Sequence, residues 1–205
     1  MFAIVESGSI TSFPKGNKGI KIGDYNYPPA VFTLWSESER NAIGVYTVEI
    51  DNTNKKDQAW YINTNQTYAF GSGKVTATYG TATAKPIADT KWTQTEIDNG
   101  DAPTGADTNT VKDEGLKTTK KRIIDNQCKS ILAPSDWMAS KAFEEGGDVE
   151  SGWKTWRASV RTKCNSMQTQ IGNAANIDAL IALFTYVKQE DGSLTRPLGE
   201  FPIKE

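Results

Sequence analysis

The chain has 205 residues, and its 23 lysines and arginines nearly balance its 25 aspartates and glutamates. A formal net charge of −2 provides no global attraction to nucleic acid or to an anionic membrane surface. The sequence contains no histidine, which excludes Ser-His and Cys-His nucleophile activation and histidine-ligated zinc. We therefore expect a protein that is not an enzyme, that has no catalytic residues and that binds neither a cofactor nor a metal.

Targeting and redox signals are equally sparse. No apolar run is long enough to cross a bilayer, and the first ten residues lack the basic region and long apolar core of a signal peptide. We therefore predict synthesis in the cytoplasm and no membrane insertion. The two cysteines, Cys128 and Cys164, have no CxxC spacing, and each is predicted to be a small buried hydrophobic residue. Acidic clusters such as Glu144-Glu145 are interpreted as surface charge rather than as paired catalytic carboxylates.

The N-terminal part (residues 1–50) predicts a compact ββαβ-like module. Two strand-like segments flank Gly8, which can take the positive φ of a tight hairpin turn. Ser36 and the glutamate three residues later form a capping box, so a short helix is expected to begin there and to end near Gly44. The alternating segment after this glycine predicts a strand at residues 45–50.

Residues 51–90 form a Thr/Ala-rich β region with a hairpin turn at Gly71-Ser72-Gly73. These strands carry few large apolar side chains, so we expect them to pack against the N-terminal module, a symmetry mate or a partner protein. Residues 91–110 are polar and rich in turn signals, and they predict a linker or an exposed loop.

Residues 111–185 predict a helical domain. An amphipathic helix capped by Asp107 or Thr108 is expected to run to about Leu132, where Pro134 ends it. Its basic run, residues 117–122, suits either an acidic partner or, more simply, solvent. Ser135 is predicted to cap the next helix.

Two glycines after residue 145 then break the chain before a helix that extends to about Met167. Trp153 and Trp156 lie three residues apart on this last helix, and Trp137 is expected to point into the same corner. The tryptophans therefore predict a core cluster, while a ring left exposed at its edge would be an interaction anchor. The tail, residues 186–205, contains a hairpin signal at Asp191-Gly192 and either crosses a neighbouring chain or frays. The whole sequence predicts an α+β fold, with a small β-rich N-terminal half, made of the ββαβ-like module plus a hairpin, followed by a helical-hairpin C-terminal half.

One set of motif residues lies in the helical half: Lys129 to Ala133, Ser135-Asp136-Trp137, Trp153, Trp156-Arg157, Val160 and Arg161. The segment that contains them resembles the C-terminal part of bacteriophage tail assembly chaperones and small tail-fibre-associated virion proteins, with Trp156 in place of the usual tyrosine. The first residues, Phe2-Ala3-Ile4-Val5, together with Tyr27-Pro28 and Trp35-Ser36, are similar to the start of small tail proteins of marine phages.

The resemblance implies a non-enzymatic structural protein of the phage virion, located in the baseplate, tail fibre or fibre-attachment region of the tail. It also implies contacts with other phage tail proteins and a homo-oligomer in a symmetric assembly. A transient assembly chaperone, absent from the mature virion, is the first alternative. A carbohydrate-binding module for host recognition, using Trp60, Tyr61 and Tyr68, is the second. The candidate interaction or core anchors are Trp137, Trp153, Trp156, Arg157 and Arg161.

Overall fold

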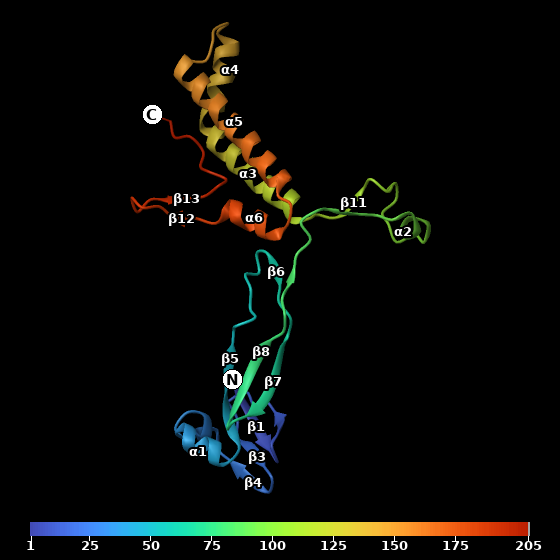
Figure 1. The fold of residues 1–205 in the computed structure, drawn as a ribbon, viewed down its shortest axis with the longest axis vertical. Helices are drawn as coiled ribbons and strands as arrows, with labels where there is room; N and C mark the ends of the chain where they lie inside the picture. Colours follow the sequence, from blue (N-terminus) through green and yellow to red (C-terminus); the bar gives the residue numbers. More distant parts are fainter. Residues whose placement is uncertain (205) are drawn as a thin grey trace. The chain divides into compact units, whose positions relative to one another are not determined.

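A computed structural model describes residues 1–204 and confirms the α+β class, with a β-rich N-terminal half and a helical C-terminal half (Figure 1). The chain divides into two compact units, Met1–Thr83 and Ala84–Glu205. The first unit contains β1 (Phe2–Glu6), β2 (Ser9–Ser12), β3 (Ile20–Ile22), β4 (Tyr25–Tyr27), the 3-10 helix η1 (Pro29–Phe32), α1 (Glu37–Ala42), β5 (Val45–Asp51), β6 (Tyr61–Ile62), β7 (Gln66–Gly71) and β8 (Lys74–Tyr79), and β9 (Thr83–Ala84) lies at the boundary.

The first unit is built on a five-stranded sheet with the order β2-β1-β5-β8-β7. β5 and β8 are parallel, and the other neighbours are antiparallel. The predicted hairpin turn at Gly8, the capping box at Ser36 and the stop at Gly44 are all confirmed. The Thr/Ala-rich hairpin of β7 and β8 packs on the N-terminal module, which is the first of the three neighbours that the sequence left open.

Strand β1 is buried on both faces because successive side chains point to opposite sides of a sheet. Ala3 and Val5 join one core cluster with side chains of β5 and β8. Ile4 joins a second cluster with Val31 and Phe32 of η1, on the opposite face.

The edge strands β2 and β7 contact each other. Just after β2, the ring centroid of Phe13 lies 4.6 Å from that of Tyr68 in β7. Tyr68 is thus part of an aromatic pair, and Trp60 is buried. The aromatic residues that suggested a sugar-binding surface are therefore used at least partly for packing.

The second unit contains a pair of long helices, α3 and α5, which lie side by side with α4 at one end of the pair (Figure 1). Their shared core is formed by Ile124, Cys128 and Leu132 of α3 and by Val160, Cys164, Met167 and Ile171 of α5. The elements of this unit are β10 (Thr90–Lys91), α2 (Gln94–Asp98), β11 (Val111–Asp113), α3 (Leu116–Leu132), the 3-10 helix η2 (Ala133–Ser135), α4 (Asp136–Glu144), α5 (Ser151–Asn173), α6 (Ile177–Phe184), β12 (Val187–Lys188) and β13 (Leu194–Thr195). Asn176 caps α6 through its side chain, and the hairpin predicted at Asp191-Gly192 is confirmed.

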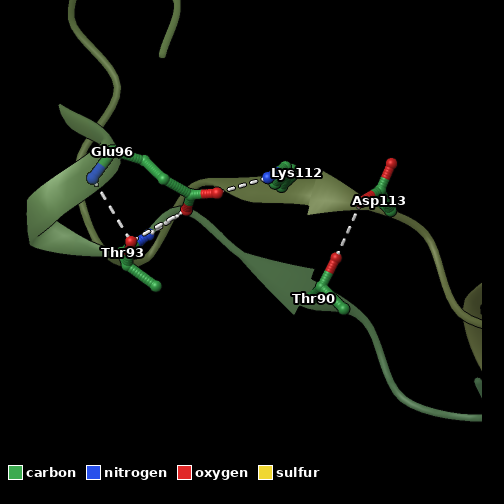
Figure 2. Close-up of polar contacts among 5 residues, drawn as sticks. All are labelled: Thr90, Thr93, Glu96, Lys112 and Asp113. Atoms are coloured by element: carbon green, nitrogen blue, oxygen red, sulfur yellow. Dashed lines mark hydrogen bonds and ion pairs between the residues drawn. The ribbon is translucent and has the colours of Figure 1, made fainter. Parts of the chain in front are cut away.

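Residues 90–113, where the sequence predicted a linker or an exposed loop, form a hairpin-like arm. Thr93 and Glu96 make a capping box that starts α2, and Glu96 also accepts a hydrogen bond from Lys112 across the arm (Figure 2). Thr90 and Asp113 are joined by a second side-chain hydrogen bond of 3.1 Å. Helix α2 was not predicted, because its five residues are too few to show the repeat of apolar residues by which a helix is recognised in a sequence.

Helix α3 begins at Leu116, later than predicted from Asp107 or Thr108. Asp107 forms a local turn instead, in which it accepts hydrogen bonds from Asn109 and Thr110. The start of α3 is held from the other side of the arm, since Asp89 accepts hydrogen bonds from the Gly115 amide at 2.7 Å and from the Thr118 hydroxyl at 2.8 Å. Within residues 1–204 no helix combines the length and the apolar character needed to span a membrane.

Candidate protein-interaction site

The two halves of the motif singled out in the sequence meet at the α4 corner (residues 133–157). Arg157 of α5 is only 7% exposed. Its Nη1 donates to the carbonyl of Leu132 at 3.0 Å and to the hydroxyl of Ser135, and its Nη2 donates to Oδ1 of Asp136 at 2.6 Å. The Leu132 carbonyl belongs to the last turn of α3, where carbonyls have no partner within the helix. Arg157 therefore closes the end of α3 and fixes the start of α4.

Ser135 does not cap α4 as predicted. It is buried, its side chain makes no capping hydrogen bond, and its hydroxyl donates to the Leu132 carbonyl at 2.8 Å. The reason is geometric, because the 3-10 helix η2 continues directly into α4 and leaves Ser135 inside the turn. The restart between the helices is therefore stabilised by Arg157, a residue 22 positions later.

Trp153 and Trp156 are half-buried, and both contact the C-terminal tail. Their rings meet edge to face with centroids 5.5 Å apart. The indole N–H of Trp156 donates to the carbonyl of Pro202 at 3.0 Å, and the ammonium of Lys204 lies 5.3 Å from the Trp153 ring centroid. The tail thus lies on α5 of its own chain. The sequence had predicted a tail that either crosses a neighbouring chain or frays.

Trp137 does not join the core. Its side chain is 57% exposed, and α4 as a whole contributes no buried residue. The same helix exposes 89% of Phe143. An indole of this size in solvent on a helix held by a buried arginine is typical of an interaction surface rather than of a folding core.

Arg161, the last candidate anchor, is exposed on α5 near the buried pair Cys128 and Cys164. Burial, followed by a hydrogen bond that the Cys128 thiol donates to Cys164, raises the pKa of the Cys128 thiol to about 11, although the Arg161 charge lowers it. Since the thiolate is the reactive form, Cys128 is kept in its inert, protonated state. Both cysteines are buried as predicted.

The largest cavity described in this unit, of about 750 Å³, lies between α3 and the tail. One wall is a network in which Tyr186 donates to Glu200 at 2.7 Å and Arg196 donates to the same carboxylate at 3.0 Å. Burial raises the pKa of Glu200, but these hydrogen bonds outweigh it and the net pKa is lowered. The hydrogen bond to Glu200 raises the pKa of Tyr186. We interpret this network as an anchor of the tail.

A second cavity, of about 300 Å³, opens at the α4 corner, and its wall includes Trp137 and Trp153. Sequence reasoning named both tryptophans but not the acidic residues beside them, which it treated as surface charge. The available signal was the density of carboxylates just after α4, at Glu145, Asp148 and Glu150, within a few positions of a tryptophan. Within residues 1–204 no group of three cysteine or acidic residues is placed to hold a metal ion.

Comparisons with protein-family models, with curated proteins and with solved structures found no match for this chain.

Proposed function

We propose that this protein is a non-enzymatic structural component of a bacteriophage tail, located in the baseplate, the tail fibre or the fibre-attachment region. In this role it binds other tail proteins and belongs to a symmetric assembly that contains several copies of the chain. The sequence resemblance at both ends of the chain supports the tail assignment, and the α4 corner supports a role in protein contacts.

The observation that carries the protein-contact role is the combination of a rigid base with an exposed helix. Arg157 is buried and joins the end of α3 to the start of α4 through three hydrogen bonds. Helix α4 itself buries no side chain and presents Trp137 and Phe143 to solvent. A helix that is fixed in place before binding loses little conformational freedom when a partner covers it. Exposed aromatic residues on such a helix are suited to be the anchors of an interface.

The arm of residues 90–113 is a second candidate contact surface. It is stiffened by its own contacts, because the Lys112 ammonium donates to Glu96 and lies 4.8 Å from the Trp92 ring centroid. A pre-ordered hairpin of this kind suits insertion against a neighbouring subunit, and this supports the multi-subunit assembly.

Mass spectrometry of purified, intact virions tests the proposal. We expect the chain to be present in tails in a fixed ratio to the other tail proteins. Absence of the chain from tails that contain their other proteins at full occupancy would contradict a structural role and would instead support the transient assembly chaperone.

A complementation assay then tests the α4 corner. Phage lacking this gene are complemented with Trp137→Ala, and Thr162→Ala, at an exposed position on the neighbouring helix, serves as the surface control. We expect Trp137→Ala to lower incorporation into virions while the control retains it. Equal incorporation of the two variants would remove α4 from the interface.

A further inference from the structure

The 300 Å³ cavity at the α4 corner combines an exposed indole with an excess of negative charge. Trp137 forms part of its wall, and the charged residues of the lining are one lysine, Lys141, and the three carboxylates of Glu145, Asp148 and Glu150. Because a positive charge is attracted both to carboxylates and to the face of an indole, this composition favours a cation over an anion or a neutral apolar group.

We infer that this cavity binds the ammonium or guanidinium end of a lysine or arginine side chain on a partner protein. The inference rests on the proposed function, since it names the chemistry of the partner at the α4 corner. Apolar side chains of Met138 and Val149 also contribute to the lining. They provide surface for the aliphatic stem of such a residue, while its charged end meets the carboxylates.

The ion pairs already present at the cavity are weak enough to be replaced. Lys141 approaches Glu145 at 3.8 Å, and Lys154 approaches Asp148 at 3.2 Å, with all four side chains more than half exposed. Exposed pairs of this kind contribute little to stability, because water screens them. The carboxylates can therefore turn to an incoming cation without loss of a strong internal contact.

The chain itself shows that an ammonium is compatible with this corner. Lys204 of the tail places its ammonium 5.3 Å from the ring centroid of Trp153, which is also part of the cavity wall. A second lysine, brought by a partner, would meet the same chemistry at Trp137. A metal ion is a poorer fit, since within residues 1–204 no three cysteine or acidic residues are grouped to coordinate one.

The test is an NMR titration of the full chain with two short peptides, acetyl-Gly-Gly-Lys-Gly-Gly-amide and its norleucine counterpart, which has the same stem without the charge. The indole N–H signals of Trp137 and Trp153 are observed after assignment by Trp137→Phe and Trp153→Phe. We expect the lysine peptide to shift both signals saturably and the norleucine peptide to leave them unchanged.

Two variants locate the binding. Trp137→Ala, and separately the triple variant Glu145→Gln, Asp148→Asn and Glu150→Gln, are each expected to weaken the affinity for the lysine peptide by about tenfold or more, which is observed at the Trp153 signal. Both variants should fold, because α4 buries no side chain and Glu150 makes no side-chain cap on α5. The matched control is Glu144→Gln, which changes an exposed carboxylate outside the cavity lining and should bind as the unmodified chain does.

Equal shifts with the lysine and norleucine peptides would overturn the inference, as would unchanged affinity in the Trp137 or the triple variant, or no saturable shift with the lysine peptide. The virion experiment remains independent of these results. If the chain is found in tails and the lysine peptide does not bind, the cavity assignment alone is wrong. If the peptide binds and virions lack the chain, the structural role alone is wrong.

Discussion

The guanidinium of Arg157 and the carboxylate of Asp136 lie 2.6 Å apart although 21 residues separate them in the chain. The two ends of this ion pair differ in environment, because Arg157 is buried and the side chain of Asp136 is 63% exposed. Mutation of Arg157 should therefore lower the free energy of unfolding more than mutation of Asp136 does.

Arg157→Ala is expected to reduce the free energy of unfolding of the second unit by about 1 to 3 kcal/mol, since it removes the donor to the buried Ser135 hydroxyl and one of the two donors to the Leu132 carbonyl. Asp136→Asn should cost only about 0 to 1 kcal/mol, as for other exposed partners. Native-state hydrogen exchange of amides in α5 measures both values. Arg161→Ala, an exposed arginine one turn away, is the control and should stay within about 0.5 kcal/mol of the unmodified chain. Equal losses for Arg157→Ala and Arg161→Ala would contradict this account.

Trp156→Phe removes the indole donor to the Pro202 carbonyl and keeps an aromatic ring. We expect a loss of about 0.5 to 1.5 kcal/mol, the usual contribution of one hydrogen bond. Heteronuclear NOE values of Ile203 and Lys204 should fall as the tail loosens, while Leu198 stays ordered through its amide hydrogen bond to Leu183. Unchanged NOE values would show that the indole does not hold the tail.

Trp156→Ala measures how much the burial of the indole ring contributes to the stability of the second unit. Removal of the side chain of a fully buried tryptophan would cost about 3 to 5 kcal/mol of unfolding free energy. Since the ring is half-buried, we expect about 1 to 3 kcal/mol. Chemical denaturation gives this value, and a loss at or above the higher range would restore the core assignment.

Gly115→Ala tests the anchor between the arm and α3. A Cβ at this position would lie closer than 3.0 Å to the backbone carbonyl of Ala88, which cannot move away as the end of a flexible side chain can. We expect a loss of about 1 to 3 kcal/mol in thermal unfolding of the second unit. Gly147→Ala is the matched control, because a Cβ there would meet no atom within 4 Å. Similar melting temperatures for the two variants would show that the Gly115 contact is not constrained.

The arm should lose order in acid. Hydrogen bonds from Lys112 and from Thr93 lower the pKa of Glu96 from 4.5 to about 2. Because the folded-state pKa is lowered, these contacts stabilise the arm fully above the ordinary pKa of glutamate, and the stabilisation is lost as the pH falls toward 2. Amide signals of Thr93 and Glu96 followed by NMR between pH 6 and pH 2 (Figure 2) should report this transition, and Glu96→Gln should abolish it. A transition that persists in Glu96→Gln would assign it to another group.

Much of the fold follows from local sequence signals. Ser36 with Glu39, the hairpin glycines and Asn176 act within a few residues, so their chemistry can be read directly from the sequence. The helical pair was predictable from apolar spacing for the same reason. Glu96, by contrast, belongs to a capping box that starts a helix of only about one turn. Such a short helix contains no repeat of apolar residues from which it could be predicted.

The α4 corner could be predicted only in part. Its residues were identified, but Trp137, which was expected to point into the core, is exposed, and Arg157, which was named only as an interaction or core anchor, is buried. The spacing of residues along a helix shows which side chains share a face, but it does not show which other element packs against that face. The Leu132 carbonyl, which attracts Arg157, is a backbone group that every residue possesses and that no side-chain pattern reveals.

The tilted contact between the rings of Phe13 and Tyr68 has a further consequence for the first unit. An unpaired sheet edge is a template to which a strand from another chain can add. Here the strands at the two edges, β2 and β7, approach each other where these rings meet. A visiting strand would first have to part the two rings, so neighbours of this unit are expected to bind its loops and faces rather than to extend its sheet.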